Sequence, residues 1–519
     1  MKRSTLILAL LILIYLINGI CSINADAITS DEGSHLSYGI RLLKRNPERT
    51  DPEKDNSKMP ISVLNALPRA VEQLFTSDQH KNDFGFSDTI HGRYVTLLFS
   101  ILIILLVFTW SRELYGINAG LFSAFLFVFC PNNLANAILV TTDTYAVFFL
   151  LATLYALWKY SNQPQNKYLI WFALLLGLSQ LAKQSLFHLF ILAPLCYLCF
   201  ALVNRQPVIW GRLLRNLLLI GSISWFIINA GFLFYGMNRQ LGEYHFMSVL
   251  FNRVQQLFPP GMPVPFSSAF ITGLDQAKFY DQLGGGFSNS SFGNVTILGH
   301  SSTGGSFWYY YLVTLLFKTP LTYLVFFGWS IYLLVKKTSL TSFVRHEFFL
   351  LAPVIYYLVL MSFFYKTQCG IRHIIFIYPF LFILSGILLR QLDMRNNLPA
   401  LLLLCIFLLI STGRYFNNYF AYTNELIGDK KNAWRYVGAA NLNFGQANFL
   451  VKKYLEKHPD VKMAAEEPGV GKFLLPVDRY LDIWNTGQYA WLRKLQPVDE
   501  VEYCYLLFEV KAPSAQPEK

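Results

Sequence analysis

Charged residues are scarce in this chain of 519 residues, where Asp, Glu, Lys and Arg together make up only 14%. A soluble globular protein carries about 25%. Hydrophobic residues reach 54%, and the mean hydropathy is +0.37. So few charges could not hydrate the surface of a soluble protein of this length. The composition therefore predicts a multi-pass membrane protein.

Three further features are missing. The net charge is +12, but there is no long basic run with interleaved aromatic residues, so the sequence gives no indication of nucleic-acid binding. The seven cysteines form no disulfide framework, and Cys196 and Cys199 lie in an apolar run where small buried side chains are expected. Residues 469–472 (GVGK) lack the first glycine of a P-loop, and Phe473 stands where Ser or Thr is needed.

Long apolar runs predict about eleven membrane-spanning segments. The third is the weakest, because Pro131 interrupts it. The first could be a cleaved signal peptide, but we favour a retained helix. The expected segments are 4–20, 93–110, 117–131, 144–160, 168–182, 185–203, 216–236, 318–335, 347–365, 373–389 and 398–413.

The distribution of basic residues predicts the orientation. With the N-terminus in the cytoplasm, every inner loop is basic, while the short outer loops hold only Lys183, Lys366 and Arg372. This places 21–92, 237–317 and the tail on the outer side. We expect an all-α transmembrane domain over 1–413 and a small extracytoplasmic α/β domain over 414–519, with a helix near 446–458 and a strand near 501–510.

Several ionisable groups converge on this outer edge. They are Asp31, Glu32, Asp55, Lys58, Asp143, Lys183, Lys318, Arg372 and His373, with the amide of Asn56 beside them. Ionisable groups at membrane depth are costly and indicate a functional site. Transfer from a lipid-phosphate donor fits this set, because cations stabilise a leaving phosphate and a carboxylate orients or deprotonates an acceptor hydroxyl. Two carboxylates near a histidine leave a divalent cation open as a cofactor, but nothing fixes such a geometry.

An ordered set of motifs along nearly the whole chain resembles the GT-C glycosyltransferases. The nearest branch is the protein O-mannosyltransferase-like, phospholipid-carrier-dependent family. The motifs are DEGSHLSYG, DNSKMPISVLNALP, LVTTD, LFKTPL, GIRHIIFIYPF, YTNELIGDKKNAWRYV and WLRKLQPVDEVEY.

The resemblance implies a mainly helical membrane enzyme, generally inverting, that uses a polyprenyl-phosphate sugar on the outer face. It implies a hexosyl- or pentosyltransferase with a protein, lipid or glycan acceptor. Asp31 would be the catalytic carboxylate, supported by Glu32, with Asp143 as the second acidic residue. The candidates for the donor phosphate are Lys183, Lys318, Arg372 and His373; those for the acceptor and first loop are Asp55, Asn56 and Lys58.

The chain departs from the family pattern near its last span. Many relatives carry Asp-Trp where this chain has Asn443-Phe444, which puts the acceptor in doubt. A transporter or flippase of lipid-linked glycans and a non-catalytic scaffold remain alternatives, although we find no internal repeat of the kind that transporters show. The expected location is the plasma membrane of a prokaryote, with the endoplasmic reticulum as the alternative. Pro- and Gly-rich residues 259–305 predict a mobile loop over the site, or a disordered connector.

Overall fold

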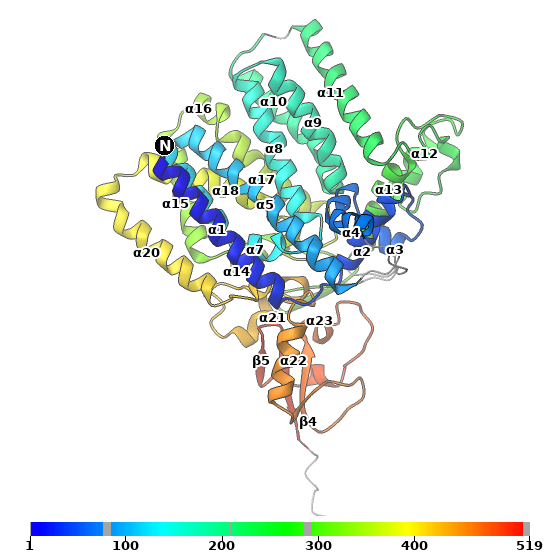
Figure 1. Cartoon of the computed structure of the whole chain (residues 1–519), viewed down its shortest axis with the longest axis vertical. Coiled ribbons are helices and arrows are strands. Elements are labelled where there is room, and N and C mark those ends of the chain that lie inside the picture. The colour runs from blue at the N-terminus through cyan, green and yellow to red at the C-terminus, as the bar shows by residue number, and fades with distance from the viewer. Residues whose placement is uncertain (1, 76–84, 208, 285–292, 512–519) are drawn as a thin grey trace, which may run out of the picture.

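A computed structural model describes residues 2–75, 85–207, 209–284 and 293–511 of the chain (Figure 1). A large helical bundle carries a small mixed domain at one end. The chain starts at the far end of the bundle, and α1 (Lys2–Ala25) runs toward the C-terminal domain. This architecture confirms the predicted all-α membrane protein with a small C-terminal α/β part.

Five single helices are long and apolar enough to cross a membrane. Two bent pairs pass the same test together, which gives up to seven spans by length and composition among the described residues. Each of the eleven predicted ranges contains helix. These helices are α1, α5 (Phe86–Tyr115), α6 (Ile117–Val128), α7 (Pro131–Ala137), α8 (Asp143–Asn162), α9 (Asn166–Ala182), α10 (Leu189–Val203), α11 (Trp210–Gly231), α14 (Tyr310–Lys318), α15 (Leu321–Lys337), α17 (Phe348–Phe363), α18 (Tyr378–Ser385), α19 (Ile387–Gln391) and α20 (Met394–Gly413).

Prolines explain the two bends. Pro131 begins α7 after a break of two residues, and the axis turns by 66° there. Pro320 separates α14 from α15, and the axis turns by 113°. Proline has no amide hydrogen and cannot continue the hydrogen-bonding pattern of a helix, but it fits its first turn. The interruption predicted at Pro131 is therefore present.

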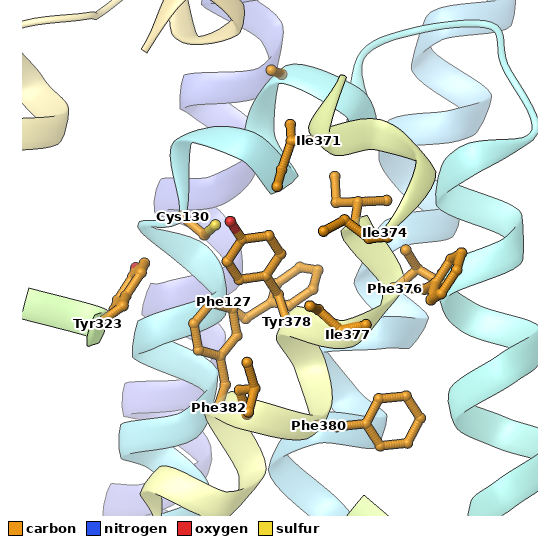
Figure 2. Close-up of a cluster of buried hydrophobic side chains, with 14 of the residues drawn as sticks. Phe127, Cys130, Tyr323, Ile371, Ile374, Phe376, Ile377, Tyr378, Phe380 and Phe382 are labelled. Atoms are coloured by element: carbon orange, nitrogen blue, oxygen red, sulfur yellow. The ribbon is translucent and has the colours of Figure 1, made fainter. Parts of the chain in front are cut away.

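Buried aromatic side chains of α6, α15 and α18 form a cluster inside the bundle (Figure 2). The rings of Tyr323 and Phe382 lie 4.9 Å apart, and those of Tyr378 and Phe382 lie 5.9 Å apart. All three residues are fully buried. Ile371 lies above this cluster, so the turn that follows it rests on close-packed rings.

The described parts of the two long connections contain helices and a hairpin. The first contains α2 (Glu32–Leu43), α3 (Pro52–Asp55) and α4 (Val63–Phe75); the second contains α12 (Val249–Gln256), α13 (Ser268–Leu283) and the hairpin β1 (Asn294–Ile297) and β2 (His300–Thr303). Residues 259–305, predicted as a mobile loop, contain all of α13 and the hairpin. Residues 285–292 of this range lie outside the described part of the chain. Hydrogen bonds from Arg49 Nε to the Ala269 carbonyl and from the Asn294 amide to the Ile483 carbonyl join these segments to each other and to the C-terminal domain.

The C-terminal domain has a four-stranded sheet in the order β3-β4-β6-β5. Strands β3 and β4 are parallel and the other pairs are antiparallel. The helix expected near 446–458 and the strand expected near 501–510 are both confirmed. The elements are α21 (Ala433–Tyr436), α22 (Asn448–Lys457), β3 (Val461–Met463), β4 (Gly471–Pro476), α23 (Val477–Tyr480), β5 (Asp499–Val501) and β6 (Tyr505–Val510).

Candidate active site

Asp31 and Arg372 form an ion pair between segments that are 341 positions apart in the chain. Asp31 precedes the first turn of α2, and its Oδ2 accepts a hydrogen bond from Arg372 Nη1 at 2.8 Å. The Asp31 side chain is 32% exposed, against 12% for Arg372. The pair therefore has a protein-facing cation and a carboxylate that a second molecule can reach.

The C-terminal segment holds Arg372 in place. Gly370 has φ +84°, and a Cβ there would meet the Ala440 carbonyl oxygen at 2.7 Å, so the approach requires glycine. The Ile371 amide donates to Asn441 Oδ1 at 3.0 Å. The Arg372 guanidinium lies 4.4 Å from the centre of the Phe444 ring, a cation–π contact. Residues after the last span thus help to build the site.

Lys58 is the second cation close to Asp31. It is buried, and within the described ranges its ammonium group makes no hydrogen bond to protein. Arg49 Nη2 donates to its backbone carbonyl at 2.6 Å, which fixes the turn after α3. Burial alone would raise the pKa of Asp31, but the charges of Arg372 and Lys58 hold that pKa below its usual range. Burial lowers the pKa of Lys58 itself, against the attraction of Asp31.

Asp143 and Lys183 form a neighbouring ion pair. Asp143 begins α8, and Lys183 lies directly after α9. Only 5% of the Asp143 side chain and 18% of the Lys183 side chain are exposed. The charge of Arg372 also acts on Asp143, so the two pairs belong to one electrostatic cluster.

Glu32 points into the protein instead of toward this cluster. Its carboxylate pairs with Arg93 Nη2 at 2.6 Å, and both side chains are 0% exposed. It also accepts hydrogen bonds from the amides of Thr29 and Val140. Glu32 thereby joins the start of α2 to α5 and to the loop before α8. Support of Asp31 by Glu32, and a direct role of Glu32 in the reaction, both stay predictions.

The other predicted cations differ in accessibility. Lys318 is 1% exposed, and its Nζ donates to the carbonyls of Phe420 at 2.8 Å and Asn441 at 2.6 Å. It lines a small cavity together with Arg372. His373 is half-buried, with Nδ1 3.4 Å from the Tyr311 hydroxyl. Binding of donor phosphate by Lys318 or His373 stays a prediction, and the structure gives Lys318 a clear role in packing.

The three candidates in the first loop, Asp55, Asn56 and Lys58, also differ in their surroundings. Asp55 pairs with Arg41, and Asp55 Oδ2 accepts from the Asp51 amide. The buried carboxylate of Asp55 therefore closes the loop on itself. Asn56 is half-buried and lies between Asp55 and the Lys58 turn. Of the three, Lys58 is the one whose charge acts on Asp31.

Sequence reasoning missed His35, one helical turn after Asp31. The residue is 3% exposed, and its Nδ1 is buried without a hydrogen-bond partner in the described ranges. Asp31, Lys58, Asp143 and Arg372 all act on it electrostatically, and burial first, then Lys58, lowers its pKa. A neutral imidazole therefore lies beside the charged cluster. The sequence signal that could have indicated His35 is its position four residues after Asp31, on the same side of a helix.

Asn443, where this chain departs from the family pattern, is hydrogen-bonded to a carboxyl group. Asn443 Nδ2 donates to Asp478 Oδ1 at 2.5 Å, and burial raises the pKa of Asp478. A carboxyl group from α23 therefore lies against the position where many relatives carry an acid. No group of three His, Cys, Asp or Glu within the described ranges is arranged to hold a metal ion.

Known proteins give two kinds of similarity. The family model described as dolichyl-phosphate-mannose-protein mannosyltransferase matches residues 84–226. The solved structure of ArnT from Cupriavidus metallidurans bound to undecaprenyl phosphate is 14% identical, with a TM-score of 0.50, over 77% of this chain and 62% of ArnT. This protein shares the fold of ArnT.

The matched part of this chain spans about 62% of the length of ArnT. An oligosaccharyltransferase from Archaeoglobus fulgidus is 14% identical over 81% of this chain and 54% of its own, with a TM-score of 0.45. No curated protein matches the sequence significantly. The fold and the apolar helices make the chain an integral, multi-pass membrane protein.

Proposed function

We propose that this protein is a membrane glycosyltransferase. It moves a sugar from a polyprenyl-phosphate donor to an acceptor hydroxyl on the extracytoplasmic side of the membrane. The observation that carries the proposal is the Asp31–Arg372 ion pair with Lys58 beside it. It combines one reachable carboxylate with two cations, one of which has no hydrogen-bond partner among the described residues.

Accessibility supports Asp31 as the catalytic carboxylate in this proposal. Its side chain is 32% exposed, whereas Asp143, Asp55 and Glu32 are at 5%, 6% and 0%. A group that touches the acceptor must be reachable by it. Asp143 then acts with Lys183 as the second acidic residue, which sets the field around the sugar.

Arg372 and Lys58 bind the donor phosphate in this mechanism. Arg372 is shared between Asp31 and the phosphate when the donor is bound, so its hold on the Asp31 carboxylate weakens. The pKa of Asp31 then rises toward its usual range, and the carboxylate becomes a stronger base where the acceptor arrives. The proton affinity of Asp31 is thereby linked to donor binding.

The transfer step is a single displacement. Asp31 takes the proton of the acceptor hydroxyl while the hydroxyl oxygen attacks the anomeric carbon. The bond between that carbon and the phosphate oxygen breaks, and Arg372 and Lys58 stabilise the charge on the leaving polyprenyl phosphate. Attack opposite the leaving group inverts the anomeric configuration.

The known proteins support this donor class. The matching family model describes mannosyl transfer from a dolichyl phosphate, and the ArnT structure contains undecaprenyl phosphate. Both are polyprenyl phosphates. A hexose or pentose as the sugar and the plasma membrane of a prokaryote as the location are parts of the same proposal.

Mass spectrometry of glycans and glycolipids tests the proposal in cells that lack the gene. The cells are supplied with the wild-type chain, with Asp31→Asn, or with Asp460→Asn, a control at an exposed carboxylate of the C-terminal domain. We expect one glycosylated product to return with the wild type and Asp460→Asn and to stay absent with Asp31→Asn at equal protein levels. Return of that product with Asp31→Asn would rule out a catalytic Asp31. If the profile of glycans and glycolipids changes neither on deletion nor on rescue, the result would favour a non-catalytic scaffold.

A further inference from the structure

The connection after α11 presents an apolar surface that no other described segment covers. None of the residues of α12 is buried. Five apolar side chains of α12 and the turn after it are at least 41% exposed. They are Val249 (53%), Leu250 (48%), Val254 (41%), Leu257 (77%) and Phe258 (46%), and we call them the α12 face.

Hydrogen bonds hold the backbone that carries the α12 face. The Asp275 carboxylate accepts from the amides of Met247 at 2.8 Å and Ser248 at 2.9 Å. Gln255 Nε2 donates to the carbonyls of Leu241 at 2.7 Å and Tyr244 at 2.9 Å. These contacts satisfy polar groups within the connection and point the apolar side chains outward. The exposure is therefore built into the fold.

The α12 face lies on the connection that follows α11, and α11 carries exposed apolar side chains of its own. Leu214, Leu217, Leu218 and Phe226 of α11 are 55–62% exposed, as expected for side chains against acyl chains. Trp225 Nε1 donates to the Pro265 carbonyl at 2.5 Å, which ties the connection to the end of α11. Figure 1 shows α12 beside the lower end of α11, on the flank of the bundle.

We propose that the α12 face lies in the membrane interface at the site end of the bundle. Its apolar side chains enter the acyl boundary of that leaflet, and the exposed Arg253 remains with the headgroups. The occupant of the face is thus the lipid bilayer, because a hydrogen bond ties the connection that carries the face to the end of α11, a long apolar helix with exposed apolar side chains. A contiguous apolar patch of this kind is unusual on a surface that meets only water.

Helix α13 connects the α12 face to the loops that carry Lys58 and Lys183. Arg49 Nε donates to the Ala269 carbonyl of α13 at 2.9 Å, and Arg49 Nη2 donates to the Lys58 carbonyl. Gln184, next to Lys183, donates from Nε2 to the Gly273 carbonyl of α13 at 2.7 Å. The position of α12 in the leaflet therefore fixes the height at which Lys58 and Lys183 face a lipid-borne ligand.

Spin-label accessibility in nanodiscs tests the placement without any substrate. The full chain carries Leu257→Cys or the matched control Glu467→Cys, at an exposed residue of the C-terminal domain. Each is labelled with a nitroxide and placed in phosphatidylcholine–phosphatidylglycerol nanodiscs. The unsubstituted chain, labelled in the same way, gives the background from its seven free cysteines.

We expect the label at 257 to collide mainly with oxygen and the label at 467 mainly with a water-soluble nickel complex. The calculated depth of the label at 257 should be about 5–10 Å below the headgroups. Equal exposure of both labels to the nickel complex would overturn the proposal. Protection of the label at 257 from both reagents would also overturn it, in favour of a protein partner such as a second copy.

Discussion

Replacing Arg93 with alanine should destabilise the protein more than any surface substitution. The Glu32–Arg93 pair is 0% exposed on both sides, and removal of one partner of a buried ion pair costs about 3–5 kcal/mol. Arg93 also donates to the carbonyls of Asp26 at 2.9 Å and Ala27 at 2.6 Å, which would lose this partner. We therefore expect the loss to lie in the upper part of that range.

The free energy of unfolding can be measured by titration with sodium dodecyl sulfate, followed by circular dichroism. Replacing both Glu32 and Arg93 with alanine should cost less than the sum of the two single changes, because neither charge is then left unpaired. The control is Lys472→Ala, in an exposed ion pair of the C-terminal domain, which should leave the unfolding free energy unchanged.

Two results would refute this reasoning. Arg93→Ala within about 0.5 kcal/mol of the wild type would show that the pair does not hold the start of α2. Full loss of sugar transfer in Glu32→Gln with unchanged stability would assign Glu32 a role in the reaction itself. We expect instead that Glu32→Gln lowers both stability and transfer, since it leaves the Arg93 charge buried without its counter-ion.

Three further predictions concern the residues around Asp31. Because Arg372 and Lys58 hold the pKa of Asp31 low against the effect of burial, the carboxylate stays ionised and its pairing stabilises the fold above about pH 4, with loss as the pH falls below that value. Arg372→Gln should move the acidic limb of the pH–rate profile to higher pH, and an unmoved limb would contradict the pairing. Phe444→Leu should weaken binding of undecaprenyl phosphate, measured by native mass spectrometry, through loss of a cation–π contact of about 0.5–2 kcal/mol; equal affinity would show that the ring does not position Arg372. Lys318→Met should speed proteolytic release of the C-terminal domain, because its two carbonyl contacts join α14 to that region; weaker lipid binding with unchanged proteolysis would instead make Lys318 a phosphate ligand.

The sequence was informative where charge is rare. Asp31, Asp143, Lys183 and Arg372 stand out between apolar runs, and the structure joins them into two neighbouring ion pairs. The break at Pro131 was predictable for the same kind of reason, because proline lacks the amide hydrogen that a helix interior needs.

Other parts of the site depend on contacts that no local pattern encodes. Arg93 lies at the start of an apolar run and resembles an interface residue until Glu32 is found against it. The guanidinium of Arg372 rests on Phe444, which follows it by 72 positions in the chain. Lys318 donates to backbone carbonyls of the segment after the last span, and the sequence does not show that this segment lies against it.

The central claim is that Asp31 carries out sugar transfer from a polyprenyl-phosphate donor. Its most direct test is the release of free polyprenyl phosphate from the donor that glycolipid profiling identifies, by purified protein in nanodiscs with acceptor present. We predict release by the wild type and by Asp460→Asn, and a rate about 10²–10⁴-fold lower for Asp31→Asn. Release by Asp31→Asn at the wild-type rate would contradict the account.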